Sequence, residues 1–215
     1  MKANNNYKKL AIAIVGISVI VIISIIIYTK IFKPKPITEI KKNIVYISGY
    51  YKEYPNDDDP RFYIEFKDDG TFILMYDDSR RSQEDYGDDG AGYSQNIRFH
   101  TGKYKMENGN YLIKPTNGAR VVFKDSASVD KGLISFYKEE NYEQDSQVVG
   151  MIVCKLKNGQ YMLGAPTEDK KSYRKDVYYY LLYNKSDIKK LPSSPEEFRK
   201  QFKMDKKAEQ ERLAD

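Results

Sequence analysis

The 215-residue chain has few of the residues on which metal and redox chemistry depend. It contains one cysteine, one histidine and no tryptophan. A single cysteine excludes an internal disulfide, a multi-cysteine zinc site and an iron–sulfur cluster, and a single histidine excludes any site that needs two imidazoles. The sequence also lacks a glycine-rich phosphate-binding loop. We therefore expect no metal site, no cofactor and no enzymatic activity.

Positive charge is concentrated at the start of the chain. Residues 1–42 contain eight Lys against one Glu, a net charge of +7, whereas residues 43–215 contain 28 Lys and Arg against 30 Asp and Glu, a net charge of −2. Nucleic acids are bound mainly through clustered cations that meet phosphates. The nearly neutral larger part of the chain therefore argues against a nucleic-acid partner.

Residues 10–28 form an uncharged run, LAIAIVGISVIVIISIIIY. As a helix it spans about 28 Å, close to the roughly 30 Å of a bilayer's hydrocarbon core. No small-residue cleavage pattern follows it, and Cys154 lies too far along the chain for a lipoprotein signal. We expect an uncleaved, single-pass signal anchor in the cell membrane. Residues 1–9 then form a cytoplasmic basic tail, residues 29–42 a basic, proline-containing linker, and the rest of the chain is extracytoplasmic.

From residue 43 the hydrophobic pattern alternates, which is typical of half-buried β-strands. Asp-Gly or Asn-Gly pairs, which favour hairpin turns, occur at residues 69–70, 108–109, 117–118 and 158–159. About ten strands are predicted in this way. Residues 43–190 therefore predict a mainly β domain, an antiparallel meander that forms a barrel or a strongly bent sheet.

The end of the chain, residues 191–215, predicts a C-terminal helix and tail. Ser194 is suited to the N-cap, Pro195 to the first helical position and Glu197 to a capping box. We expect one helix from there to about residue 212, with Phe198 and Phe202 directed towards the sheet.

Three segments resemble the strand–turn–strand rhythm of small lipocalin-like (calycin-like) domains in bacterial surface proteins: FKDDGTF at residues 66–72, GKY at 102–104 and NGNYLI at 108–113. The resemblance covers about half of the predicted β domain. It implies a meandering barrel with a ligand cavity, and it carries over no ligand-binding residue. The order of a basic tail, one span and a β-rich domain is also similar to the layout of membrane-anchored immunity proteins, which guard Gram-positive bacteria against secreted toxins.

Residues 53–89 are strongly acidic, with 13 Asp and Glu against four Lys and Arg. If residues 61–76 form a hairpin, its open end brings two acidic clusters together. These clusters are Asp57, Asp58 and Asp59, and Asp77 and Asp78. They are candidates for a docking surface for a cationic partner, for a solvated rim neutralised by nearby arginines, or for a calcium site, although their spacing does not match the calcium-loop pattern.

The connection at residues 77–95 is long and rich in Gly, Asp and Ser, which is typical of binding segments or disordered ones. Tyr86 and Tyr93 are candidate contact anchors there. His100 alternates out of phase with Ile97 and Phe99 and should point away from their core.

We expect a membrane-tethered, extracytoplasmic protein-interaction module that binds through its acidic loops, as an immunity or adaptor protein would. Its partner would be a cationic protein or a secreted toxin. An alternative is a lipocalin-like carrier of a small apolar ligand. A third is an enzyme whose carboxylate site the sequence does not reveal.

Overall fold

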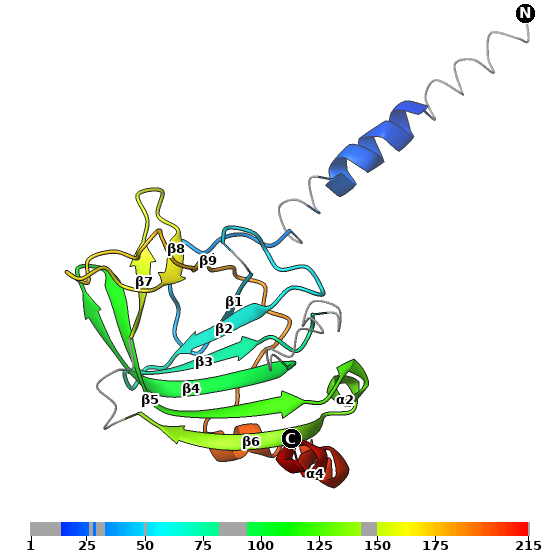
Figure 1. The fold of residues 1–215 in the computed structure, drawn as a ribbon. Helices are drawn as coiled ribbons and strands as arrows, with labels where there is room; N and C mark the ends of the chain where they lie inside the picture. Colours follow the sequence, from blue (N-terminus) through cyan, green and yellow to red (C-terminus); the bar gives the residue numbers. More distant parts are fainter. Residues whose placement is uncertain are drawn as a thin grey trace, which may run out of the picture. The chain divides into compact units, whose positions relative to one another are not determined.

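The structure is a computed structural model that describes residues 14–25, 28, 33–49, 51–81, 94–142 and 150–214. The chain divides into two compact units, Met1–Lys35 and Pro36–Asp215. The second unit contains all the strands (Figure 1).

In the first unit, residues 14–25 are helical, and their isoleucine and valine side chains are exposed, with Ile20 at 64%. The predicted transmembrane helix of residues 10–28 is not found in this form, because parts of that range lie outside the described residues. Among the residues that are described, no helix combines the length and apolarity needed to cross a membrane.

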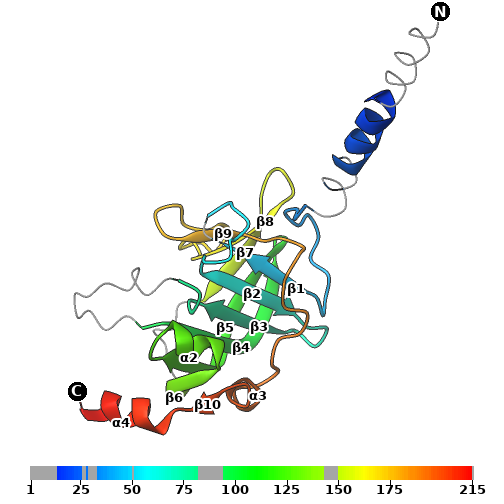
Figure 2. The ribbon, with the colours of Figure 1, turned by 90° about the vertical axis from the view of Figure 1, so that its right-hand side faces the viewer.

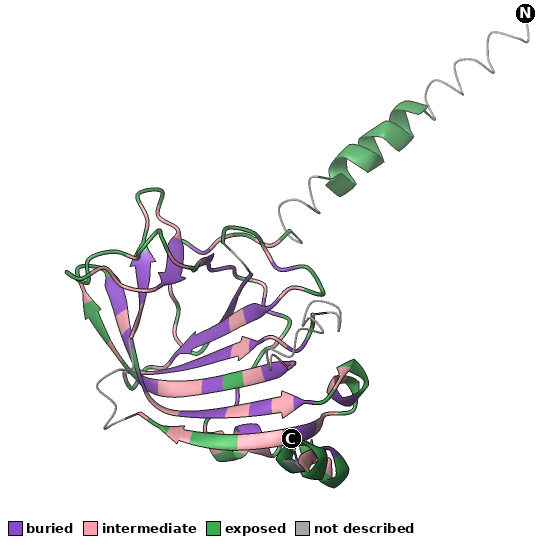
Figure 3. Ribbon diagram, viewed as in Figure 1, coloured by how far each residue is buried: buried purple, intermediate pink, exposed green. Residues whose placement is uncertain are grey.

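The second unit is mainly β, as predicted. Its strands are β1 (Val45–Ser48), β2 (Arg61–Phe66), β3 (Thr71–Asp77), β4 (Asn96–Glu107), β5 (Asn110–Phe123), β6 (Leu133–Asn141), β7 (Met151–Lys155), β8 (Tyr161–Gly164), β9 (Tyr179–Leu181) and β10 (Lys203–Met204). Its helices are α2 (Ser126–Asp130), α3 (Pro195–Arg199) and α4 (Lys206–Ala214). Strands β1, β2, β3 and β8 are largely buried, whereas β4 and β6 have many intermediate and exposed residues and α4 is mostly exposed (Figure 3).

The strands form one sheet in the order β1-β2-β3-β4-β5-β7-β8-β9. Its two end strands approach each other, because Ile47 N donates to Tyr183 O at 3.3 Å, Tyr183 N donates to Ile47 O at 2.8 Å and Leu181 N donates to Tyr51 O at 2.7 Å. The result is a nearly closed antiparallel barrel, which confirms the β part of the predicted fold class and is compatible with a lipocalin-like fold.

Strand β5 bonds to two different strands along the edge opposite β4. Residues Tyr111 to Ile113 pair with β7, whereas Asn117 to Phe123 pair with β6. Because one edge accepts one neighbour at a time, β6 and β7 diverge between these two stretches. The barrel is therefore split next to Pro115, and β4, β5 and β6 extend beyond β7 and β8 (Figure 1).

Three of the four predicted hairpin turns are confirmed. The turn at Asn108-Gly109 has positive φ at both residues, 51° and 78°, as a type I′ turn requires. Gly70 and Gly159 also have positive φ, in slightly longer connections. The predicted turn at residues 117–118 is wrong, because this pair lies inside β5.

A C-terminal helix is present as predicted, but it is not the single helix to about residue 212 that we expected, because the segment is divided into α3 and α4. Ser194 caps α3, since its Oγ accepts a hydrogen bond from Glu197 N at 3.1 Å. The chain then leaves the helix, and β10 pairs in parallel with β6 before α4 begins (Figure 2). This pairing satisfies backbone groups of β6 that no other described strand reaches. Phe198 is fully buried and stacks on Phe99 with ring centroids 5.4 Å apart, as expected.

Phe99 and Phe198 lie on the outer face of the sheet, and the opposite face, which carries Phe66 and Tyr111, lines the barrel interior. The rings of Phe66 on β2 and Tyr111 on β5 have centroids 4.8 Å apart, although β3 and β4 lie between these strands in the sheet. Such a contact requires the two side chains to meet across the interior. At this end Lys42 lies over both rings and over Tyr104, with Nζ 4.3 to 5.3 Å from the centroids. Aromatic side chains and one lysine thus fill one end of the barrel.

Candidate functional site

Towards the split in the sheet, the barrel interior contains a cavity of about 370 Å³. Four aromatic side chains line it: Phe62, Tyr76, Tyr142 and Tyr180. Three aliphatic side chains, Leu74, Pro115 and Met151, and two polar ones, Arg98 and His100, complete the lining. Apolar walls with a small number of polar groups are typical of small-molecule sites.

The cavity lies at the point where β5 changes partner. Pro115 has no N–H, so it donates no backbone hydrogen bond there. Tyr142 follows the end of β6, and Met151 begins β7, so the two diverging strands each supply one wall. The wall opposite comes from β2 and β9, where the rings of Phe62 and Tyr180 have centroids 4.3 Å apart.

Gly118 allows Tyr142 to line the cavity. A Cβ at Gly118 would lie 2.8 Å from Cε2 of the Tyr142 ring and 3.0 Å from the carbonyl oxygen of Phe99. The Tyr142 hydroxyl donates to the Glu140 carboxylate, and the ring lies 5.8 Å from that of His100. The glycine that we expected to make a turn therefore makes room for an aromatic side chain inside a strand.

His100 is directed into the barrel interior, away from Phe99, as its phase in β4 predicted. Burial lowers the pKa of His100 to about 4, with a smaller raising contribution from Glu140 and a smaller lowering one from Arg98. The imidazole is therefore neutral at pH 7. Its Nδ1 is buried, and among the described residues it has no hydrogen-bond partner.

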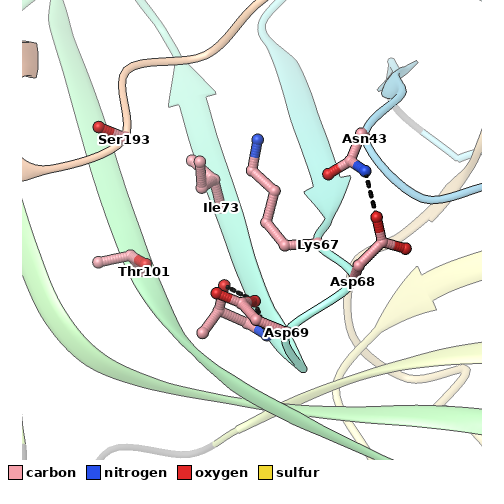
Figure 4. A pocket seen from close by; sticks show the side chains of 8 residues that line it. Asn43, Lys67, Asp68, Asp69, Ile73, Thr101 and Ser193 are labelled. Atoms are coloured by element: carbon pink, nitrogen blue, oxygen red, sulfur yellow. Dashed lines mark hydrogen bonds between the residues drawn. The ribbon is translucent and has the colours of Figure 1, made fainter.

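A second pocket, of about 390 Å³, lies beside the turn between β2 and β3 (Figure 4). Its polar groups are engaged locally. Asn43 Nδ2 donates to Asp68 Oδ2 at 2.6 Å, and Asp69 Oδ1 accepts from Thr71 N at 2.9 Å. These contacts stabilise the turn, so we regard the interior cavity as the candidate site.

The acidic residues singled out from the sequence lie near one end of the β2–β3 hairpin, where Arg61 pairs with Asp77 in register. Asp57 and Asp58 are exposed, whereas Asp59 is half-buried and its carboxylate accepts a hydrogen bond from Asn56 N at 2.8 Å.

Asp77 and Asp78 are engaged with neighbouring side chains. Asp77 is buried and lies 3.1 Å from Arg80 Nε, and Asp78 Oδ1 lies 3.0 Å from Arg81 Nε. Burial raises the pKa of Asp78. Tyr86 and Tyr93 lie outside the described residues. Within the part of the chain that is described, no group of three or more metal-ligating side chains was found.

Arg61 organises the loop that carries the first acidic cluster. Its side chain is 5% exposed and donates to the carbonyl oxygens of Asn56, Asp57 (3.0 Å) and Asp59 (3.2 Å). Arg61 Nη1 also lies 3.3 Å from the carboxylate of Asp187, which Arg80 Nη2 contacts at 3.2 Å. The sequence does not reveal that Asp187 contacts Arg61, because 126 residues separate the two and no local pattern links them.

We predict that Arg61→Ala destabilises the protein by about 2–4 kcal/mol, because it leaves several carbonyl oxygens without their donor and removes one of the two arginines that contact Asp187. Arg61→Lys should recover only part of this loss, since a lysine cannot reproduce the guanidinium fork. Urea unfolding measures the change. Asp58→Asn, at an exposed position, is the control and should change stability by less than about 0.5 kcal/mol. An unchanged midpoint for Arg61→Ala would show that the loop does not depend on this residue.

We predict that His100 makes stability pH-dependent. Its pKa of about 4 in the folded state lies below the ordinary value near 6.5, so its contribution is fully present above pH 6.5. As pH falls from 6.5 to 4, the unfolded chain binds a proton that the folded chain does not, and about 3 kcal/mol of stability is lost. His100→Gln removes the group that binds this proton. The difference in unfolding free energy between the wild type and the variant should therefore change between pH 6.5 and pH 4. A difference that stays constant over this range would contradict the prediction.

Comparison with protein-family models, with curated proteins and with solved structures found no match to this chain. The structure itself shows a nearly closed antiparallel β-barrel, which is compatible with a lipocalin-like fold.

Proposed function

We propose that the second unit binds a small, largely apolar molecule in the interior cavity, which is the carrier function that the lipocalin-like resemblance implies. The observation that carries this proposal is the position of the cavity. It lies inside the barrel, at the split beside Pro115, and aromatic rings from β2, β3 and β9 surround it together with Tyr142. Its volume of about 370 Å³ is in the range that accommodates small ligands.

The contrast between the two ends of the barrel supports this proposal. At the Lys42 end, Phe66, Tyr104 and Tyr111 pack against one another with ring centroids 4.8 to 5.6 Å apart. At the other end the chain places comparably large rings around a space that they do not fill. When a ligand covers apolar surface of this kind, the burial stabilises the complex by about 25 cal/mol per Å².

We also propose that residues 10–28 tether the domain to the outer face of the cell membrane. The support is the uncharged 19-residue sequence and the exposure of the apolar side chains of residues 14–25. A docking role for the acidic loop remains a second proposal, and its support is confined to the exposed Asp57 and Asp58. Their neighbours Asp59, Asp77 and Asp78 are engaged within the domain.

We predict that naphthalene-2-carboxamide, a neutral probe that fits the cavity, binds the full-length protein held in phosphatidylcholine nanodiscs. Isothermal titration calorimetry, with empty nanodiscs as the blank, measures the affinity. Met151→Trp fills part of the cavity and should weaken binding by about tenfold or more, which corresponds to about 1.4 kcal/mol. Met106→Trp is the matched control, since Met106 is 64% exposed and does not line the cavity. Equal affinities in the two variants, or no binding to the wild type, would reject the cavity as a ligand site.

We predict that protease added to intact bacterial cells expressing the chain cleaves it beyond residue 36, and that the chain stays in the membrane pellet after alkaline washing. Ile20→Lys with Ile23→Lys should release it, because each lysine at mid-span costs about 3 kcal/mol. Ile20→Leu with Ile23→Leu is the control. A protected domain, or a mature chain without its first thirty residues, would contradict the tether.

A further inference from the structure

Three cations form a row across the sheet next to the cavity. In the β4–β5 register Arg98 lies opposite Arg120, and in the β5–β6 register Arg120 lies opposite Lys138. Directly opposed residues project from the same face of a sheet. Arg98 lines the cavity, so this face is continuous with the barrel interior. Like charges directly opposite each other destabilise a sheet, so this arrangement costs free energy in the absence of an anion.

Neither arginine has a carboxylate partner within 4.0 Å among the described residues. Arg98 Nε donates to Asn96 Oδ1 at 3.2 Å, and Arg120 Nε is buried without a hydrogen bond in the described part of the chain. The other arginines each have a carboxylate or an aromatic ring as partner: Arg61, Arg80, Arg81 and Arg174 form ion pairs, and Arg199 and Arg212 lie over the rings of Tyr137 and Phe136. Arg98 and Arg120 are thus set apart from the rest.

The nearby acidic groups that the structure describes do not neutralise the row. Glu140 lies on the same face, opposite Gly118, and its carboxylate accepts the hydroxyl of Tyr142. Asp78 lies close enough to interact with Arg98, but it is held by Arg81. Among the described residues, the row of three cations therefore has one carboxylate on its own face, that of Glu140, while Asp78 is paired with Arg81. Burial already lowers the pKa of Arg120, with Arg98 adding to the effect.

From this arrangement we propose that the ligand is an amphipathic anion, whose apolar body lies against the aromatic walls and whose carboxylate or similar acid group is bound by Arg98 and Arg120. The inference rests on the proposed function and names the chemical class of the ligand. Two adjacent guanidinium groups suit an oxyanion, because each can donate two parallel hydrogen bonds. His100, which lines the same cavity, adds a neutral polar contact.

Two probes of nearly equal shape test the proposal. Naphthalene-2-carboxylate carries the acid group, and naphthalene-2-carboxamide replaces it with a neutral amide. Titration of each into the full-length protein in phosphatidylcholine nanodiscs should show that the carboxylate binds about tenfold more tightly or better. The preference should shrink as salt is raised from 50 to 500 mM, whereas carboxamide binding should not change.

Substitutions test whether Arg98 and Arg120 cause the preference for the carboxylate probe. Arg98→Met and Arg120→Met should each abolish most of the carboxylate preference, measured as the ratio of the two probes' affinities in the same variant. Glu140→Gln retains an acceptor for Tyr142 while it removes a negative charge, so it should strengthen carboxylate binding several-fold. Arg174→Met, which removes an exposed arginine elsewhere, is the control. Arg120→Met should also raise the urea midpoint without ligand, which shows that the variant is folded.

The outcomes separate this inference from the proposed function. A carboxylate preference that depends on Arg98 and Arg120 supports it. If the carboxamide binds at the cavity and the carboxylate binds no better, the anion site is wrong and the cavity proposal stands. If the carboxylate is preferred equally in Arg98→Met, Arg120→Met and Arg174→Met, the charge acts elsewhere and the anion site is also wrong. If neither probe binds, the proposed function itself fails.

Discussion

Hydrogen bonding along one edge of β5 is the constraint on which the rest of the domain depends. Each backbone position on that edge can pair with one neighbour, and β5 gives its first stretch to β7 and its second to β6. The sheet must therefore divide next to Pro115. On one side of the division the strands curl into a barrel, and on the other they continue as a sheet whose inner face stays accessible. The position of the cavity follows from this division, and so does the place of Lys138 beside Arg120, since β6 pairs with the second stretch of β5.

Local signals in the sequence predict most of the fold. Alternation and the Asp-Gly and Asn-Gly pairs depend on neighbouring residues only, so they identify the β2–β3, β4–β5 and β7–β8 hairpins. The two errors have a non-local origin. The Asn117-Gly118 pair favours a turn, but Gly118 lies in a strand. The ring of Tyr142 packs against it so closely that a Cβ there would lie 2.8 Å from the ring. The C-terminal helix ends early because β10 finds a partner in β6, which no helical periodicity reveals.

The candidate site is much harder to predict. The acidic residues attract attention because they are contiguous in sequence, yet Asp77 and Asp78 turn out to be engaged by arginines close to them along the chain. Arg98, Arg120 and Lys138 are far apart in sequence, and each looks like an ordinary surface cation. Only the register of β4, β5 and β6 aligns them. A one-residue shift of any of these strands would place its cation on the opposite face, and sequence periodicity does not specify register that closely.

The contacts of Lys42 have one more consequence. Its ammonium group and the rings of Phe66, Tyr104 and Tyr111 seal the barrel at one end. The cavity lies away from this end, where β6 and β7 diverge. If the domain carries a ligand as proposed, exchange of that ligand, and any transfer to another molecule, would take place on the side of the barrel where these two strands separate.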